Sequence, residues 1–189
     1  MATRSQTKPT RPAASVGFLN PVELLRRLDI PQGCEVADFG CGAGYFTIAL
    51  AQLVGEQGVV HAIDVRTEPL EALVGRAKLE GIYTIQTRRA DLESPNGSGL
   101  RDTSQDLVLM ANILFQVHDR AAVVREAHRV LKSGGRLMAI EWQAEAPLAR
   151  SFAAPATQAD VQTLAAADGF TQEHTLEAGS HHFALVFRK

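Results

Sequence analysis

The sequence has few cysteines, no long apolar run and almost no excess of charge, and each absence excludes a class of protein. Cys34 and Cys41 are the two cysteines among 189 residues, too few for a secreted disulfide framework and not spaced as metal ligands. No stretch is long and apolar enough to predict a membrane span. The formal net charge of −2 gives no attraction to a phosphate backbone, which disfavours a general nucleic-acid binder.

The beginning of the chain lacks large apolar side chains and has no acid before Glu23. Residues 1–16 are polar and contain proline, which predicts a disordered arm rather than the apolar centre of a signal peptide. A transit peptide is the alternative. We therefore expect a cytoplasmic protein with one domain over residues 17–189. A chain of 189 residues with 46% hydrophobic content can bury one core.

Strand-like and helix-like segments alternate through most of the chain. A helix that Asn20 caps comes first. The strands expected after it are 34–39, 59–64, 83–87, 106–111 and 136–141, and the helices between them are 45–54, 68–79 and 120–131. This alternation predicts an α/β fold with a doubly wound, mostly parallel sheet.

The end of the sequence departs from the alternation. Residues 143–156 contain two prolines and are expected to form an irregular loop, after which Thr157 begins another helix. Two strands, 170–177 and 182–187, follow with a glycine-containing turn between them. The chain is therefore expected to end on a β-hairpin.

The strongest indication of function is the turn at residues 40–44, which lies between an apolar strand and a helix. Glycine occupies every second position in this turn. Asp38 precedes the turn, which runs through Gly40, Cys41, Gly42 and Gly44. Glycine lets the backbone approach a ligand closely, since it has no Cβ atom. The following helix presents unpaired N–H groups and a positive dipole end. The turn therefore predicts a site for a nucleotide-type cofactor.

The spacing of the glycines narrows the choice of cofactor. A dinucleotide fingerprint requires a glycine three residues after Gly42, and Tyr45 stands there. The Lys-Ser/Thr pair of a phosphate-binding loop is also absent. The run from Asp38 to Gly44 instead resembles the first motif of class I S-adenosylmethionine (SAM) methyltransferases, Asp-x-Gly-x-Gly-x-Gly.

The resemblance extends to the segment 112–119, which is similar to that of small, single-domain methyltransferases related to ubiquinone and menaquinone biosynthesis. It implies SAM as the cofactor. It also implies a Rossmann-like, seven-stranded sheet in the order 3-2-1-4-5-7-6, with the last strand antiparallel.

Polar side chains follow the expected strands at the carboxyl edge of the sheet. Asp64 ends the second strand, where its carboxylate can accept hydrogen bonds from ribose hydroxyls. Val65, the next residue, is also expected to contact the cofactor. The resemblance implies that Asp91 binds the adenine amino group and that the N–H of Leu92 meets a ring nitrogen. Asn112 ends the fourth strand, where ligands collect, and the resemblance places the methionine part of SAM there.

Methyl transfer from a sulfonium is an in-line displacement, so aligning the acceptor supplies most of the acceleration. A general base is needed only if the acceptor must lose a proton. The candidates near the carboxyl edge are His118, Glu141, His181 and His182, of which the first three are predicted to be catalytic. In the family, an aromatic residue from the region of Phe18 often closes over the cofactor. No histidines have metal-ligand spacing, so no metal is expected.

The sequence leaves the acceptor and the oligomeric state open. It lacks the Asn/Asp-Pro-Pro-Tyr motif of amide-nitrogen methylation and an acid for metal binding after the fourth strand. The leading hypothesis is methyl transfer to a small-molecule acceptor. The alternatives are a SAM-binding protein without catalysis, or a methyltransferase for a protein or RNA that docks on Arg4, Lys8 and Arg11.

Overall fold

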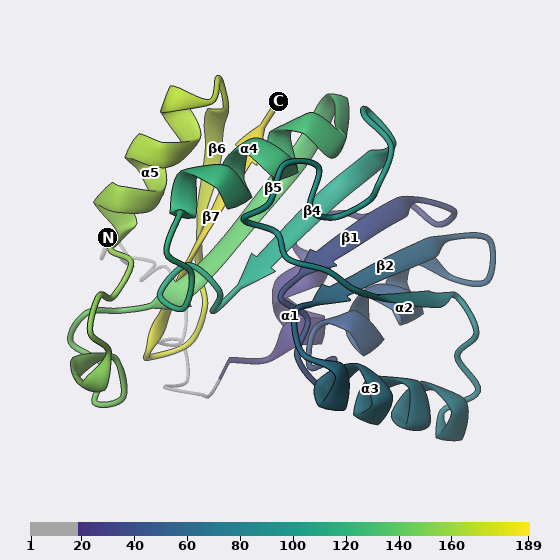
Figure 1. Ribbon diagram of the computed structural model, residues 1–189. Helices are drawn as coiled ribbons and strands as arrows, with labels where there is room; N and C mark the ends of the chain where they lie inside the picture. The colour runs from purple at the N-terminus through teal and green to yellow at the C-terminus, as the bar shows by residue number, and fades with distance from the viewer. Residues whose placement is uncertain (1–18) are drawn as a thin grey trace, which may run out of the picture.

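The computed structural model describes residues 19–189 and contains a seven-stranded sheet with helices on both faces (Figure 1). The strands are β1 (Glu35–Phe39), β2 (Val59–Asp64), β3 (Ile85–Arg89), β4 (Gln105–Ala111), β5 (Leu131–Trp142), β6 (Thr171–Glu177) and β7 (His182–Arg188). The helices are α1 (Pro21–Arg26), α2 (Thr47–Val54), α3 (Thr67–Leu79), α4 (Arg120–Val130), α5 (Gln158–Ala167) and the 3-10 turn η1 (Ala149–Ser151). The expected arm, residues 1–16, and Phe18 lie outside the described residues.

The order of the sheet is β3-β2-β1-β4-β5-β7-β6, which confirms the prediction. All pairs among strands β1 to β5 are parallel. β7 is antiparallel to both of its neighbours, β5 and β6. Because β7 runs in the opposite direction, its beginning lies at the same edge as the carboxyl ends of β1 to β5. Trp142, for example, pairs with His182. Residues far apart in the sequence therefore meet at this edge.

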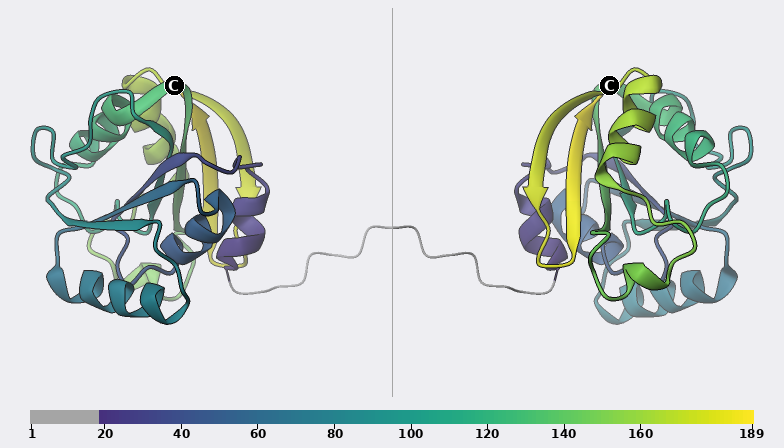
Figure 2. Two further views of the ribbon diagram at one scale, coloured as in Figure 1. Left: turned by 90° about the vertical axis from the view of Figure 1, so that its right-hand side faces the viewer. Right: turned by 90° about the vertical axis from the view of Figure 1, so that its left-hand side faces the viewer.

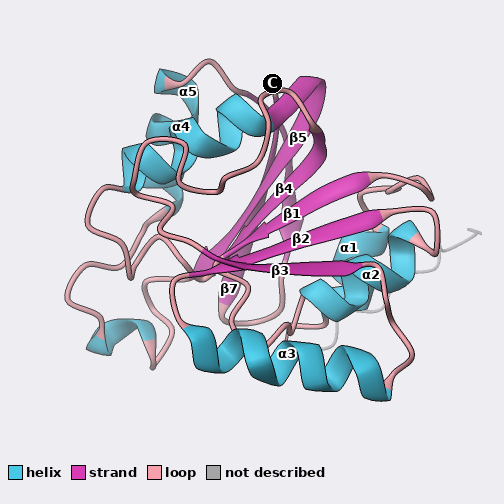
Figure 3. Cartoon of the chain, turned by 45° about the vertical axis from the view of Figure 1, so that its right-hand side comes forward, coloured by secondary structure: helices cyan, strands magenta, loops and turns pink. Residues whose placement is uncertain are grey.

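The helices divide between the two faces of the sheet (Figure 3). Leu25 of α1 and Leu50 of α2 belong to one apolar cluster with strand residues, and Leu73 of α3 packs in a neighbouring cluster with residues of α2 and β2. On the opposite face, Val123 of α4 and Val161 of α5 pack against a second set of strand residues. The sheet is thus covered on both sides, as its nearly continuous apolar strands require.

The chain's first described helix lies beside its last strands. In both side views of Figure 2, α1 runs alongside the β6–β7 hairpin. Arg27 Nη1 donates a hydrogen bond to the Glu177 carbonyl oxygen over 3.3 Å. Asn20 caps α1 as expected, because its Oδ1 accepts from the N–H groups of Val22 and Glu23.

Several predicted boundaries are wrong by a few residues. β3 begins at Ile85 rather than Tyr83, whose side chain is 84% exposed and lies before the first residue paired with β2. β5 begins at Leu131 rather than at residue 136, because the segment with the two glycines continues the strand with a register shift against β4. α2 begins at Thr47, two residues later than predicted.

The two connections that border the carboxyl edge are largely irregular. Residues 90–104, between β3 and β4, contain no helix. Residues 143–156, between β5 and α5, contain only η1, which agrees with the expected loop. Within residues 19–189, no helix combines the length and apolar character needed to cross a membrane.

Candidate active site

The glycine turn leaves β1 and folds back against β2. The N–H groups of Gly40 and Cys41 both donate to the Ile63 carbonyl oxygen, over 2.8 and 3.0 Å. Gly40, Gly42 and Gly44 have φ values of +73°, +52° and +84°, in the left-handed region that side chains disfavour. Three positive φ angles in five residues explain why this turn requires glycine at every second position.

The three glycines serve different purposes. A Cβ atom at Gly40 would come within 2.7 Å of Ile113 Cδ1, and one at Gly44 within 2.3 Å of Leu73 Cδ1. A Cβ atom at Gly42 would meet nothing within 4 Å and would enter open space. Gly42 therefore keeps a cavity open, whereas Gly44 allows close packing of the turn against α3.

Asp38 lies beneath the turn and is 2% exposed. Its Oδ2 accepts a hydrogen bond from the Thr47 hydroxyl over 2.6 Å, which ties β1 to the first turn of α2. Burial raises the pKa of Asp38 to about 7, against the opposing effect of the Thr47 hydrogen bond. This carboxyl group also borders the cavity.

Asp64 ends β2 opposite the turn. Its Oδ2 accepts from the Gly42 N–H and its Oδ1 from the Arg66 N–H, each over 2.9 Å. The side chain lines the cavity, and each carboxylate oxygen has lone-pair capacity beyond the one bond it accepts. Two hydroxyl donors on one ligand can therefore be bound here without breaking either contact.

Beyond β3, Asp91 and Leu92 form another part of the cavity wall, with Val65 at its rim. Leu92 is buried, whereas Val65 is 57% exposed. The Asp91 carboxylate accepts from the Glu93 N–H over 3.0 Å and from the Ser94 hydroxyl over 3.2 Å. This wall thus combines apolar side chains with a carboxylate, a combination suited to a flat ring that carries a hydrogen-bond donor.

Asn112 follows β4 and adopts φ = +57°, a conformation that is rare for a residue with a side chain. Its Nδ2 lies 3.3 Å from Nε2 of His182, at the beginning of β7. Its Oδ1 is buried and has no hydrogen-bond partner among the described residues. Burial lowers the pKa of His182 to about 4, so this imidazole is neutral at neutral pH.

These residues surround a cavity of about 700 Å³ at the carboxyl edge of the sheet. Of the described residues predicted to bind a cofactor, all but Gly44 line this cavity, and Phe18 lies outside the described part of the chain. Its wall is completed by Gln116, from the segment 112–119 that the resemblance indicated, and by side chains that the sequence did not indicate, among them Tyr45, Arg76 and Glu93. Arg76 and Glu93 belong to neighbouring elements and carry no motif.

A cluster of rings adjoins the cavity at Asn112. Trp142 at the end of β5 lies against His182, with ring centroids 4.0 Å apart. Phe152 lies 6.2 Å from Trp142 and stacks on Phe115 at 3.9 Å with an angle of 10° between the ring planes. We call Phe115, Trp142, Phe152 and His182 the aromatic cluster. Its four members come from four separate segments.

The three predicted catalytic residues are not brought together in the cavity. His118 is exposed, and its backbone N–H donates to Glu93. Glu141 is 1% exposed, and its Oε1 accepts from the Leu114 N–H over 2.7 Å. His181 is half-buried, whereas the adjacent His182 is the histidine next to Asn112. His182 is the first residue of β7, whereas His181 lies just before the strand, so a shift of one position along the chain brings His182 beside Asn112.

The Glu141 carboxyl group is buried behind the segment that follows β4. Burial raises the pKa of its carboxyl group to about 8, against the opposing effect of the hydrogen bonds from the backbone of Leu114 and Ile113. Its Oε2 is buried without a partner among the described residues. The geometry makes Glu141 a support for the segment after β4 rather than a wall of the cavity.

The fold and this cavity define the class: a class I methyltransferase fold with a cofactor-type cavity at its carboxyl edge. A sequence profile of the family described as "Methyltransferase domain" matches residues 30–179. The chain belongs to this family, as its glycine turn predicted.

Among curated relatives, the demethylmenaquinone methyltransferase of Bacillus cereus is 35% identical over 121 residues, which is 63% of this chain and 49% of the relative. The protein of that name from Geobacillus stearothermophilus is 30% identical over 120 residues, 63% of this chain and 50% of the relative. The chain thus spans about half the length of the curated relatives it matches.

Solved structures share the fold at lower identity. A SAM-dependent methyltransferase from Aquifex aeolicus has a TM-score of 0.79 at 23% identity, with 90% of each chain covered. The cyclase SpnF has a TM-score of 0.76 at 16% identity, over 89% of this chain and 80% of SpnF. Proteins with different names therefore share this architecture.

Proposed function

We propose that this protein is a SAM-dependent methyltransferase that acts on an apolar small molecule. The observation that supports this most directly is the cavity at the carboxyl edge. One side of it is formed by the glycine turn, Asp64 and Asp91, and the other side reaches Asn112 and adjoins the aromatic cluster. Cofactor and acceptor would then lie on either side of Asn112.

The residues present fit SAM. The open space at Gly42 admits a ligand against the backbone, and the spare lone pairs of Asp64 suit the two ribose hydroxyls. Asp91, between Val65 and Leu92 on the cavity wall, suits the adenine ring and its amino group. SAM supplies a methyl group on a cationic sulfur, which is a good leaving group. The protein's own contribution is then to align the acceptor with that methyl group.

The aromatic cluster supports an apolar acceptor. The rings of Phe115, Trp142 and Phe152 are partly exposed, whereas His182 is buried, and together they provide flat surfaces beside the cavity. The relatives named demethylmenaquinone methyltransferase make a demethylated quinol the first acceptor to test. This chain spans about half the length of those relatives, so a methyl-transfer assay with several acceptors identifies its own.

Calorimetry with S-adenosylhomocysteine is the first test, and micromolar binding is expected. Transfer of labelled methyl groups from SAM to a demethylmenaquinol analogue and to a metabolite extract is the second. Binding of NAD without any response to S-adenosylhomocysteine would overturn the proposal. Labelling of the extract but not of the quinol would retain the activity and change the acceptor.

A second candidate function is a SAM-binding protein that transfers no methyl group. It is favoured by the observation that His118, Glu141 and His181 do not line the cavity. In this case S-adenosylhomocysteine binds and no label is transferred to any acceptor. A protein or RNA acceptor that docks on Arg4, Lys8 and Arg11 is not favoured by any contact, because these residues lie outside the described part of the chain.

A further inference from the structure

The segment 90–104 contributes to the cavity through Asp91, Leu92 and Glu93. It connects β3 to β4 without a helix, so its position depends on contacts with other elements. Glu93 makes the contact that links it to the opposite wall. The inference drawn from this contact rests on the proposed function, because it concerns what a bound cofactor does to the acceptor side.

A single oxygen of Glu93 holds two backbone donors. Its Oε2 accepts from the N–H groups of His118 and Asp119, over 2.9 and 2.6 Å. Asp119 is the N-cap of α4, so the carboxylate lies at the positive end of that helix. A charged acceptor at this place makes stronger hydrogen bonds than a neutral one.

The turn at residues 91–94 carries both Glu93 and Asp91, the side chain proposed to contact adenine. The Glu93 N–H donates to Asp91 Oδ1, and the Ser94 hydroxyl donates to Asp91 Oδ2. A ligand that contacts the Asp91 carboxylate therefore restrains the turn from which Glu93 extends. The observed contacts run without a break from Asp91 through Glu93 to the beginning of α4, and a ligand bound at Asp91 would extend them.

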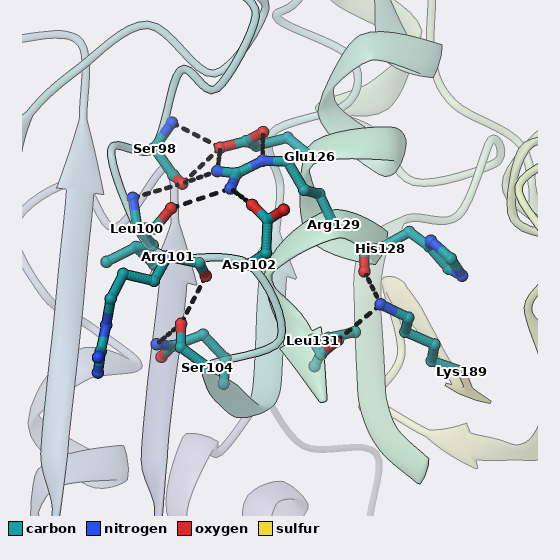
Figure 4. A network of polar contacts seen from close by, with 11 residues as sticks. Ser98, Leu100, Arg101, Asp102, Ser104, Glu126, His128, Arg129, Leu131 and Lys189 are labelled. Carbon is teal, nitrogen blue, oxygen red and sulfur yellow. Dashed lines mark hydrogen bonds and ion pairs between the residues drawn. The ribbon is translucent and has the colours of Figure 1, made fainter. Parts of the chain in front are cut away.

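The far end of the segment is anchored independently (Figure 4). Glu126 Oε1 accepts from the Ser98 N–H over 2.9 Å, and Arg129 Nη1 donates to the Leu100 carbonyl oxygen over 3.0 Å. Arg129 also forms an ion pair with Asp102. Because α4 already holds residues 98–102, the part left to respond to a ligand is the turn at residues 91–94.

The wall that Glu93 reaches lies on the acceptor side. The segment 112–119 lines the cavity with Asn112 and Gln116 and contributes Phe115 to the aromatic cluster. We propose that Glu93 is a positioning residue that couples the cofactor position to this segment, through the backbone amides of His118 and Asp119. Binding of the cofactor at Asp91 then holds residues 112–119 in place before the acceptor binds.

Hydrogen–deuterium exchange with and without S-adenosylhomocysteine tests this coupling. In the wild-type protein, the ligand is expected to slow exchange of the amides in residues 113–119 by about tenfold, the effect of strengthening hydrogen bonds to a charged acceptor. Glu93 itself borders the cavity, so Glu93→Ala is compared with wild type at saturating S-adenosylhomocysteine, with the affinity of each protein taken from calorimetry. At saturation, the ligand's protection of residues 113–119 should be lost in the variant.

Two further variants separate coupling from a purely structural role. Glu93→Gln keeps the shape and one acceptor oxygen without the charge, so it should recover part of the ligand-dependent protection. Glu56→Ala removes an exposed carboxylate from the turn between α2 and β2 and should behave as wild type. A purely structural Glu93 would change exchange equally with and without ligand.

The outcomes distinguish this inference from the proposed function. Calorimetric binding with no ligand-dependent protection of residues 113–119 in the wild type would overturn the coupling and leave the cofactor assignment intact. Equal protection in Glu93→Ala and wild type would overturn it as well. Absence of binding to the wild type would overturn the proposed function and the inference with it.

Discussion

The two sides of the cavity differ in how completely their polar groups are satisfied. On the cofactor side, both oxygens of Asp64 accept backbone hydrogen bonds, and Asp38 accepts one from Thr47. On the side proposed for the acceptor, Asn112 has a positive φ angle and its Oδ1 is buried without a partner among the described residues. Glu141, which supports the segment after β4 from outside the cavity, has a buried Oε2 that likewise lacks a partner there. A buried polar atom without a partner costs free energy.

This difference indicates that the polar groups around Asp64 are satisfied before a ligand binds, with the turn at residues 91–94 left to respond, whereas the side proposed for the acceptor holds unfavourable interactions. Strained backbone and unpaired groups persist only where the surrounding structure holds them in place. The β5–β7 pairing and the aromatic cluster supply that support. Changes on the cofactor side should therefore affect folding or cofactor binding, and changes on the acceptor side should affect the acceptor step.

The largest effect at a single pH is expected from Gly44→Ala. The new Cβ atom would lie 2.3 Å from Leu73 Cδ1 at a positive φ angle, so the free energy of unfolding should fall by about 3 kcal/mol. Gly42→Ala is the matched control, since its Cβ atom meets nothing and should cost about 1 kcal/mol. Denaturant unfolding measures both. Equal losses would contradict the separate purposes assigned to these glycines.

Asp64→Ala comes next and should weaken S-adenosylhomocysteine binding about 100-fold in calorimetry, because two charge-assisted hydrogen bonds to ribose are lost. The fold should remain, although the Gly42 N–H loses its acceptor. Glu68→Ala, an exposed acid in the first turn of α3, is the control and should bind normally. A loss of less than threefold would place the ribose elsewhere.

Glu141→Gln should alter the pH dependence of stability. Burial raises the pKa of Glu141 from 4.5 to about 8, so the folded protein keeps a proton that the unfolded chain releases between these values. The stabilising contribution is complete below pH 4.5 and decreases as the pH rises, by at most about 1.4 kcal/mol per pH unit. Between pH 5 and 8, the variant should therefore lose less stability than wild type in denaturant unfolding. Parallel profiles would contradict the raised pKa.

The smallest effect is expected from Phe152→Ala. Loss of its stack on Phe115 should raise the KM for an apolar acceptor about tenfold and leave S-adenosylhomocysteine affinity within about twofold. Leu148→Ala changes a half-exposed apolar side chain of the same loop and serves as the control. An unchanged KM together with weaker cofactor binding would reverse the assignment of the two sides.

Local sequence patterns predicted much of the fold, because strands and helices follow from short-range periodicity. The glycine turn and the acids after β2 and β3 were found because they lie close to strand ends in the sequence. The order of the sheet came from the family resemblance, since strand pairing joins distant segments. The boundary of β3 was missed because that edge strand is mostly exposed and lacks a burial pattern.

The acceptor side could not be predicted in the same way. The aromatic cluster joins residues from four segments, and its geometry depends on the register between β5 and β7. The choice between His181 and His182 depends on that register as well. The Glu93 contact links two loops whose approach no local signal indicates.

The antiparallel insertion of β7 also has a consequence for the order of folding. The contacts around the glycine turn join residues 38–64, whereas the contact between Asn112 and His182 spans 70 residues. Contacts between distant residues close larger loops and form more slowly. The part of the cavity around the glycine turn and Asp64 can therefore form early in folding. The contact between Asn112 and His182 forms only after β7 has docked between β5 and β6.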